Sequence, residues 1–478
     1  MAPGVFIWIV HTDFIVAAAG DGCKRLDRSG FCATFIFIAS MQEDELPEDL
    51  PSPPVPAGAS DHPYAIFRNR DFTFYLLGRL VALFGQLMFA MAVSWDLYER
   101  TGSALALGLV GLTQMVPMLL FTLPAGHVAD NFNRKRVVMW MTTVLAVASA
   151  GVAVISVFQA QVGWIYLCLF VGGTARTFMW AASAAFLPAL VDRKVFPRAV
   201  NWNVSVFYIS SIIGPATAGG IIAWMAGHHS AAPAAPVYAI NALTSLAFCG
   251  FISRVRRQHT VAVKEPMTLH ALLTGFKFVY ASKIILGILS LDMFAVLLGG
   301  ATALLPIYAK DILFVGPGGL GVLQAALPMG SLLCVFILNH RPPLQKAGRA
   351  MLLAVTVFGL ATIGFGLSTW FWFSILMLFT CGAVDNVSVV VRHTLVQMLT
   401  PDDKRGRVSA VNNLFISTSN ELGGFESGTV AQIFGPAMGH TIVAGAVISV
   451  VSGGIGTILV VGAVALIWPE IRRYGKLA

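Results

Sequence analysis

Residues 126–136, GHVADNFNRKR, form a short polar interruption between two long apolar segments. LALGLVGLTQMVPMLLFTLPA (105–125) precedes them, VVMWMTTVLAVASAGVAVISVF (137–158) follows them, and neither segment carries a charge. Each segment is long enough to cross about 30 Å of hydrocarbon as an α-helix. The stretch therefore predicts a tight, basic turn that joins two transmembrane helices at one face of a membrane.

The composition of the whole chain agrees with a membrane protein. Hydrophobic residues make up 57% of the 478 residues and charged residues only 11%, whereas a soluble domain has about 25% charged residues. Alternating strand patterns are absent, and every backbone amide in lipid needs a partner, so the spans must be helices. The six cysteines have no paired spacing, which predicts neither a disulfide framework nor a metal site.

We therefore predict an all-α polytopic membrane protein with twelve transmembrane helices. The expected spans are residues 72–98, 104–124, 136–158, 162–190, 199–226, 236–254, 284–309, 318–339, 349–368, 370–398, 408–433 and 440–467. Of the 31 Lys and Arg residues, 23 then fall on one side of the membrane and two, Arg100 and Lys310, on the other. Since basic residues are retained inside, the first side is cytoplasmic, and both termini lie there. The net charge of +8 is thus a topology signal rather than a sign of nucleic-acid binding.

The remaining segments divide the chain into domains. We expect residues 1–70 to form an N-terminal extension and disordered cytoplasmic tail, because residues 42–60 are acidic and rich in proline. Residues 1–40 read as an upstream extension before a natural start at Met41, with an additional membrane anchor as the alternative. A six-helix half (71–254), a cytoplasmic linker (255–283), a second six-helix half (284–467) and a cytoplasmic tail (468–478) follow.

The two halves share a sequence fragment at equivalent positions. LVDRKVFPRAVNWN (190–203) follows span four, and LTPDDKRGRVSAVN (399–412) follows span ten. At an offset of 209 residues, Arg198 matches Arg407 and Asn203 matches Asn412. This match favours an internal duplication, an architecture that many secondary transporters share.

Several motifs resemble the major facilitator superfamily. Gly126, Asp130, Arg134 and Lys135 resemble its loop motif Gly-x-x-x-Asp-Arg-x-Gly-Arg-Lys, and IIGPATAGG (212–220) is similar to the Gly-Pro motif in span five of exporters. RPPLQKAGRAMLLAV (341–355), VDNVSVVVRHTLVQMLTPDDKRGRVSAVNNLF (384–415) and STSNELGGFESG (417–428) resemble its enterobactin-exporter-type branch, the transmembrane secretion effectors. The resemblance covers about residues 71–470. It implies the twelve-helix major facilitator fold, alternating access and proton-coupled export.

The resemblance also implies roles for particular residues. Gly126, Asp130, Arg134 and Arg136 would form a cytoplasmic gate, with topology alone as the alternative role of the basic residues. Gly214, Pro215 and Gly219 would form a hinge in span five. Two departures from the loop motif are Asn131 in place of Arg and Asn133 in place of Gly, and Asn133 can adopt a left-handed turn.

A third group of candidates is the charged side chains within the spans, where a charge costs roughly 3 kcal/mol or more and usually faces a cavity or a partner. The candidates for a proton and substrate pathway are Arg79, Arg176, Asp292, Asp385 and Glu421. Arg176 and Asp385 occupy equivalent places in the two halves, so they could form a switchable pair, or a static one, or pair with other neighbours. Asp292 could carry a proton, because burial disfavours the charged carboxylate, or could form a helix-packing hydrogen bond. Glu426 and Arg392 are expected near the rims in structural roles.

The leading prediction is a secondary exporter of small amphipathic molecules such as drugs, siderophores or metabolites, driven by proton antiport. The alternatives are a membrane sensor or scaffold without transport, and a membrane-embedded enzyme, for which no nucleophile–base or metal cluster is visible. We expect no enzymatic activity, cofactor or metal. The expected partners are a small-molecule substrate, protons and the lipid bilayer, without nucleic acid, around a monomer in the bacterial inner membrane.

Overall fold

The computed structural model describes residues 65–191, 195–256, 269–340, 346–401 and 404–475. These residues are almost entirely helical, and no strand occurs among them. The expectations for residues 1–64, the upstream extension and the acidic tail, fall outside the described residues. The described chain begins before Asp71 with a short helix η2 (Ala65–Arg68), whose Ile66 is buried. The predicted disordered tail is therefore wrong for residues 65–70, because Phe67 packs edge-on against Trp202.

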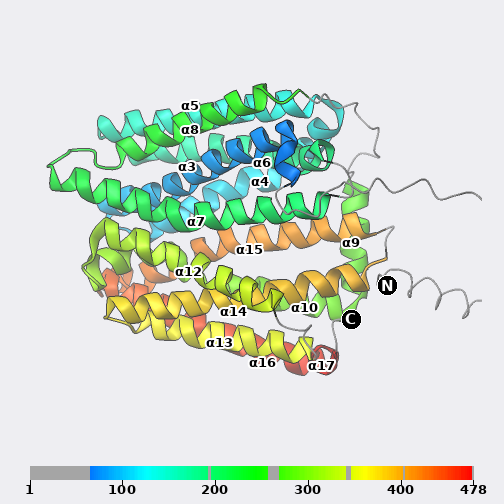
Figure 1. Cartoon of the computed structure of the whole chain (residues 1–478). Coiled ribbons are helices and arrows are strands. Elements are labelled where there is room, and N and C mark those ends of the chain that lie inside the picture. Colours follow the sequence, from blue (N-terminus) through cyan, green and yellow to red (C-terminus); the bar gives the residue numbers. More distant parts are fainter. Residues whose placement is uncertain (1–64, 192–194, 257–268, 341–345, 402–403, 476–478) are drawn as a thin grey trace, which may run out of the picture. The chain divides into compact units, whose positions relative to one another are not determined.

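Six long helices make up the first half, and Figure 1 shows them together in the blue-to-green part of the chain. They are α3 (Arg70–Thr101), α4 (Ala104–Asn131), α5 (Arg134–Val157), α6 (Val162–Leu190), α7 (Phe196–Gly227) and α8 (Ala235–Ser253). Helix α3 packs on α7 and α8, α5 packs on α6 and α8, and α4 packs on α6.

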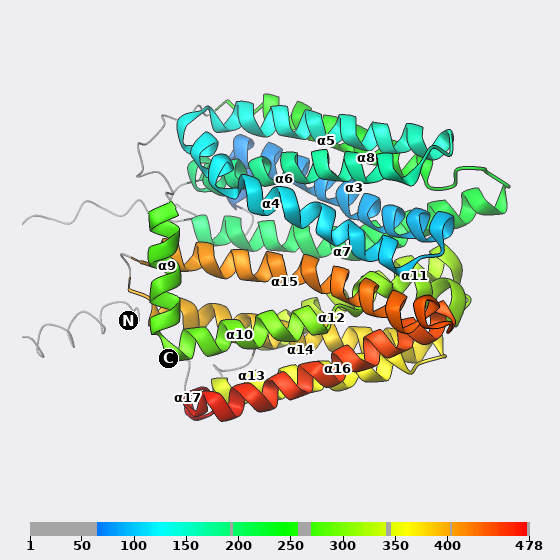
Figure 2. The same cartoon turned by 180° about the vertical axis from the view of Figure 1, so that it is seen from behind.

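The second half repeats this arrangement (Figure 2). Its helices are α10 (Lys283–Leu298), α12 (Gly316–Asn339), α13 (Ala347–Gly366), α14 (Phe371–Leu399), α15 (Arg405–Phe434) and α16 (Ile442–Ile467). The α10 span is extended by the short turns η3 (Ala301–Leu304), α11 (Leu305–Ile307) and η4 (Tyr308–Ile312), the last a π-helical turn. The smaller elements are η5 (Pro436–Met438) and α17 (Pro469–Arg473).

The twelve predicted spans correspond to twelve helices, and the major facilitator fold is confirmed. Within the described residues, eleven of these helices are long and apolar enough to cross a membrane by composition alone. The twelfth, α15, is 30 residues long but carries Asn413, Asn420, Glu421 and Glu426, which lower its hydropathy. Its polarity reflects its position, since it packs against α4 of the other half as well as α10 and α16.

The internal duplication is visible in the helix boundaries. Helices α6 and α14 both span 29 residues, and the offset of 209 residues relates both of their ends. The same offset relates the first residues of α7 and α15, Phe196 and Arg405. The contacts between the halves follow the repeat, because α4 packs on α15 and α12 packs on α7.

Residues 126–136 differ from the predicted turn. Helix α4 continues through Asn131 and α5 begins at Arg134, so only two residues connect them. Asn133 has φ −62° and ψ 108° and accepts a hydrogen bond from the amide of Arg136 at 3.3 Å. The expected left-handed turn at Asn133 is therefore wrong, because this residue caps α5 with its side chain instead.

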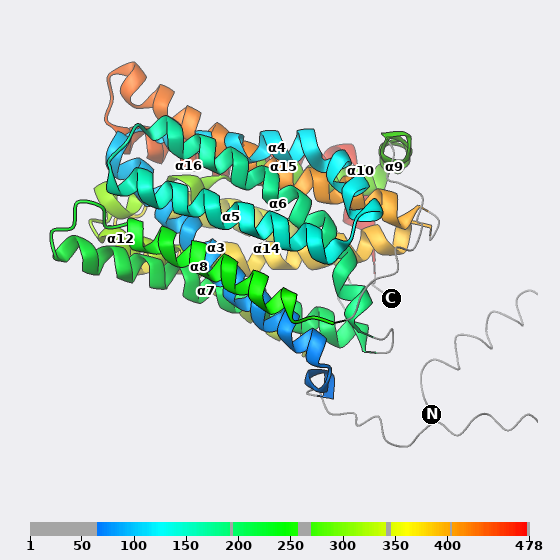
Figure 3. The same cartoon turned by 90° about the horizontal axis from the view of Figure 1, so that it is seen from above.

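The linker between the halves contains a helix that the sequence analysis did not predict. Helix α9 (Leu269–Ala281) runs across the ends of the long helices, close to α10 and α15 (Figures 2 and 3). We call this end of the bundle the α9 end, and the end that carries the α7–α8 connection the far end. The α4–α5 connection lies at the α9 end.

Single cysteines in an otherwise cysteine-free chain will test the predicted topology. Phe132→Cys and Gly406→Cys place exposed thiols at the α9 end, and His229→Cys places one at the far end. An impermeant thiol reagent added to intact cells should label only His229→Cys, and all three variants after permeabilisation. Labelling of Phe132→Cys or Gly406→Cys in intact cells would overturn the orientation with the α9 end inside.

Candidate transport site

The two halves meet through closely packed backbone near the far end. A Cβ atom at Gly219 of α7 would lie 2.4 Å from the carbonyl oxygen of Pro317 in α12, and one at Gly321 would lie 2.4 Å from that of Pro215. On α15, a Cβ atom at Gly428 would lie 2.6 Å from the carbonyl oxygen of Ala104 in α4. Small residues therefore let both helix pairs approach within backbone contact.

Polar contacts reinforce this closure at the far end. The Tyr98 hydroxyl of α3 donates to the Asp311 carboxylate of η4, and Glu99 forms an ion pair with Lys310 at 2.9 Å between Oε2 and Nζ. The Ser103 hydroxyl donates to Gln432 Oε1 at 3.1 Å. All these residues lie at the ends of their helices, so the halves are joined at the far end.

Inside the first half, Asp96 fixes the end of α3 that carries these contacts. Its carboxylate pairs with Arg100 at 3.0 Å and accepts from Tyr238 at 3.2 Å and from Ser156 at 3.3 Å. Asp96 is buried, and each donor comes from the same half. The network therefore holds Tyr98 and Glu99 in place for their contacts with η4.

Arg176 lies in the middle of α6 and faces a small pocket that polar and apolar residues line together. Gln86, Gln114, Ser149 and Asn241 line this pocket together with Arg176. With the Gln86 amide oriented so that its oxygen faces Arg176, Nε and Nη2 donate to that oxygen at 3.0 and 3.1 Å. One arginine is thus held among neutral amides and hydroxyls, which can orient it but cannot neutralise it.

The acidic residue whose charge acts on Arg176 is Glu421 of α15, in the other half. A Cβ atom at Gly111 of α4 would lie 3.4 Å from Glu421 Oε2, so the carboxylate points toward the first half. Within the described residues Arg176 forms no ion pair with Asp385, so of the predicted alternatives this conformation agrees with the one in which the two charges interact with other neighbours. The electrostatic interaction across the halves connects α6 and α15, although Arg176 and Glu421 are not in ion-pair contact among the described residues.

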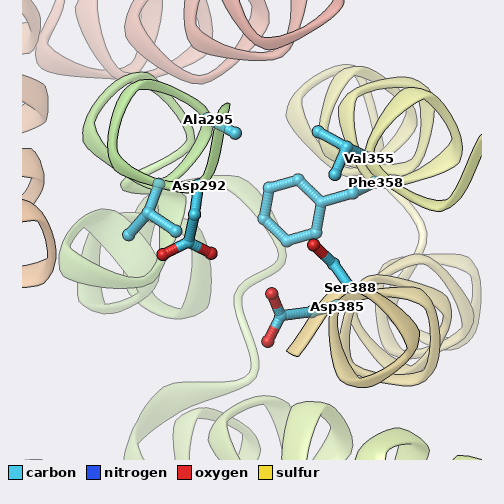
Figure 4. Close-up of a pocket in the computed structure, with 7 residues that line it drawn as sticks. Asp292, Ala295, Val355, Phe358, Asp385 and Ser388 are labelled. Carbon is cyan, nitrogen blue, oxygen red and sulfur yellow. The ribbon is translucent and has the colours of Figure 1, made fainter. Parts of the chain in front are cut away.

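Asp385 of α14 lies beside a second pocket, which has room for about one water molecule. Asp292 of α10 faces it across the pocket, and Phe358 and Ser388 complete the polar and aromatic lining (Figure 4). Within the described residues, neither the Asp385 carboxylate nor the Ser388 hydroxyl has a hydrogen-bond or ion-pair partner. Ser388 is nonetheless only 3% exposed, so its hydroxyl faces the pocket.

Asp292 forms a buried ion pair with Arg392, which lies seven residues after Asp385 on α14. Both side chains are less than a tenth exposed. This buried ion pair agrees with the structural role expected for Arg392, and its guanidinium reaches into the interior toward α10. Together Asp292, Asp385 and Arg392 carry one net negative charge when both carboxylates are ionised.

The structure also adds residues that the sequence analysis did not select. Asn386 of α14 donates to the Tyr208 hydroxyl of α7 at 2.8 Å, a contact between the halves one residue from Asp385. Neither residue is charged, and although Asn386 lies within the stretch 384–415 that resembles the exporter branch, nothing in that stretch singled it out. Arg79, a predicted pathway residue, donates from Nη1 to the Tyr75 hydroxyl at 3.4 Å within its own helix. No contact joins it to the other predicted pathway residues within the described part of the chain.

The predicted gate residues lie at the α9 end of α4 and at the start of α5. Gly126 and Asp130 are on the last turns of α4, and we find no hydrogen bond or ion pair at Asp130 within the described part of the chain. Arg134 Nε donates to the carbonyl of Ala129 at 3.2 Å, and Arg136 is exposed. Lys135 Nζ donates to the carbonyls of Ser253 and Val255, at 2.9 and 2.7 Å, and so caps the end of α8.

The predicted span-five residues divide between two surfaces. A Cβ atom at Gly214 would lie 3.2 Å from the backbone oxygen of Phe84 in α3, so Gly214 packs within the first half. Pro215 and Gly219 face α12 across the junction of the halves. Helix α7 continues through Pro215 to Gly227.

Twelve helices in two repeated halves, joined at one end, with charged residues at mid-depth between them, define a membrane transporter of the major facilitator class. The profile of the transmembrane secretion effector family matches residues 61–464. The chain belongs to that family.

Known proteins agree with this assignment. The chain is 23% identical over 409 residues to the enterobactin exporter EntS of Escherichia coli O1:K1 / APEC, a match that covers 84% of this chain and 93% of that protein. The EntS protein of Shigella boydii serotype 18 matches equally well. These relatives are exporters, not enzymes.

Solved structures share the fold. An inward-facing, unoccupied bacterial homologue of the human lysosomal transporter Spinster superposes with a TM-score of 0.65 at 13% identity, over 84% of this chain and 97% of that one. A bacterial homologue of the iron transporter ferroportin in an inward-facing state gives a TM-score of 0.61 at 16% identity, over 82% and 98% of the two chains.

Gly219→Leu should loosen the closure at the far end, because its side chain meets the backbone of Pro317, which cannot rotate away. A cost of roughly 1.4 kcal/mol, within the range for overpacking, would lower the equilibrium ratio of closed to open molecules about tenfold. Closure is measured by the rate of disulfide formation between Ser103→Cys, at the start of α4, and Gln432→Cys, near the end of α15. Gly220→Leu is the matched control, because its Cβ atom meets open space; equal cross-linking rates in both backgrounds would contradict the prediction.

Asp292→Asn and Arg392→Gln should each destabilise the fold by about 3–5 kcal/mol, because each leaves a buried charge without its partner. The double variant should recover much of this loss, since no unpaired charge remains. Unfolding of the purified protein in detergent measures these differences. Glu99→Gln provides the comparison at the partly exposed pair with Lys310 and should cost less than about 1 kcal/mol; equal losses at both pairs would be inconsistent with a buried structural pair.

Proposed function

We propose that this transporter exports small amphipathic molecules from the cytoplasm by alternating access, coupled to proton antiport. The observation that carries the proposal is that Arg176 and Glu421, opposite charges from different halves, lie at mid-depth and act on each other electrostatically, while the halves are closed together at the far end. When the two halves rock, opposite charges that lie in different halves change their distance and surroundings. A static scaffold has no need of charges placed in this way.

The direction of export rests on the orientation of the bundle. The excess of Lys and Arg in the connections at the α9 end supports placing this end in the cytoplasm. The conformation would then be closed toward the outside, the state that accepts cargo from the cell interior. In the same orientation Gly126, Asp130, Arg134 and Arg136 lie at the cytoplasmic mouth, where the proposed gate must form.

The cargo would bind near Arg176. The amides of Gln86 and Gln114 offer donors and acceptors in the adjoining pocket, and Phe89 offers an apolar surface beside them. Such a lining suits a molecule with both polar and aromatic groups. The relatives' name makes a catecholate siderophore such as enterobactin the first compound to test, beside a panel of amphipathic drugs.

Among the three predicted carboxylates, Asp385 is the best candidate to carry the proton. Asp292 is bound to Arg392, and Glu421 experiences the charge of Arg176, whereas Asp385 has no ionic partner among the described residues. One proton on Asp385 would neutralise the net charge of its cluster, and the Ser388 hydroxyl would be within the same pocket. Burial among Phe358, Val355 and Ala295 disfavours the charged form.

Transport by the purified protein in liposomes tests the proposal, with a substrate first found by exposing an efflux-deficient bacterial host to the compound panel. A gradient of about one pH unit should support up to about tenfold accumulation for each proton exchanged. Asp385→Asn should abolish this accumulation while downhill exchange of labelled substrate continues. Glu426→Gln, which neutralises another intramembrane carboxylate, is the control that should accumulate normally.

The outcomes separate the parts of the proposal. If Asp385→Asn accumulates substrate and Glu421→Gln does not, Glu421 carries the proton. If all three variants Asp292→Asn, Asp385→Asn and Glu421→Gln concentrate substrate normally, the carboxylate mechanism is wrong. If no compound in the panel is moved by the unmodified protein in the host or in liposomes, a sensor or scaffold replaces the exporter.

A further inference from the structure

Helix α9 has one face that is firmly packed on the second half. Val279 is 2% exposed and belongs to an apolar cluster with Val408 and Val411 of α15, and Phe276 packs against Phe415 with ring centroids 5.8 Å apart. A Cβ atom at Gly275 would lie 2.8 Å from the carbonyl oxygen of Arg407. Glycine at this position therefore allows α9 to lie directly on the backbone of α15.

Another face of α9 carries a stripe of exposed residues. Leu273, Lys277 and Tyr280 follow one another at helical spacing, and Leu273 and Tyr280 are 56% and 79% exposed. Lys283, the first residue of α10, is also exposed. We call these four residues the α9 stripe.

The α9 stripe lies where the surface of the bilayer must be. Helix α9 crosses the ends of the spanning helices (Figures 2 and 3), and it packs beside α15 along residues 407–415 rather than beyond its end. Leucine and tyrosine beside lysine are typical of helices that rest in the interfacial region. No acidic residue occurs between residues 269 and 291, so the stripe is purely basic and apolar.

We propose that the α9 stripe binds the headgroups of anionic phospholipids. Lys277 and Lys283 supply the positive charges for the phosphate, and Leu273 and Tyr280 lie at the boundary between headgroups and acyl chains. The consequence is mechanical, since a lipid-bound α9 supports the end of α15 that it packs against. This inference concerns binding and does not depend on transport or on its coupling to protons.

Lipid retention by the purified protein tests the charge part of the proposal. Native mass spectrometry with added phosphatidylglycerol or phosphatidylcholine should show preferential retention of phosphatidylglycerol. Lys277→Gln together with Lys283→Gln should weaken this retention by about fivefold for each lysine removed, because one basic residue near an anionic surface contributes about that factor. Arg349→Gln, an exposed arginine at the start of α13, is the matched control and should retain the lipid at close to the unmodified level.

A fluorescent label tests the position of the stripe. Tyr280→Cys in a cysteine-free chain, labelled with an environment-sensitive dye and placed in nanodiscs, should be quenched by lipids with a nitroxide on the headgroup and protected from aqueous iodide. Iodide quenching without nitroxide quenching would mean that the stripe faces the cytoplasm as a surface for a soluble protein, and would overturn the proposal. Unchanged phosphatidylglycerol retention in the double lysine variant would overturn it as well.

Discussion

The contact of backbone with backbone at four helices is the constraint on which the rest of this structure depends. Helices in lipid gain little from burying apolar side chains against one another, because the surrounding acyl chains are equally apolar. The halves are therefore joined where glycine removes the side chain altogether, at Gly219 and Gly321 between α7 and α12 and at Gly428 between α15 and α4. Such an interface gives close packing without interlocking side chains. In the proposed alternating access it would separate and reform as the halves rock. The partly exposed ion pair of Glu99 with Lys310 adds a modest contribution to closure, beside the buried Tyr98 hydroxyl that donates to Asp311.

This way of joining the halves decides where charge can be useful. A charged side chain inside one half must be satisfied there, as Asp292 is by Arg392, and it then contributes to stability and to the position of α10 against α14. A charge at the junction can interact with an opposite charge in the other half, as Arg176 does electrostatically with Glu421. Only the second kind responds directly to the relative position of the halves. Asp385 belongs to neither kind, and the proposed proton exchange at its carboxylate rests on its having no ionic partner among the described residues.

The fold could be predicted from the sequence because the number and orientation of the spans follow from features that can be read along the chain. Segment length and the positions of Lys and Arg fixed the twelve spans, and the fragment shared by residues 190–203 and 399–412 gave the offset that relates α6 to α14. The residues that each charged side chain contacts could not be predicted from the sequence. Two residues at equivalent positions of the two halves need not be neighbours in the folded protein. Arg176 and Asp385 are equivalent, but each faces different neighbours. Helix α9 was missed because its 13 residues are too few to span a membrane and lie within the connection between the halves. Asn133 caps α5 because α4 continues past its apolar segment to Asn131.

Helix α15 shows why these features belong together. One rigid helix of 30 residues carries Gly428 at the closed junction, Glu421 opposite Arg176 and the surface on which α9 rests at the other end. Its polarity is a cost that a purely structural span would not need, since Asn and Glu side chains are disfavoured in lipid. A rigid helix cannot move at one end without turning at the other. Any loosening at Gly428 must therefore displace Glu421 relative to Arg176 and change the contacts of α15 with α9, so the closed junction, the mid-depth charge and helix α9 are mechanically connected.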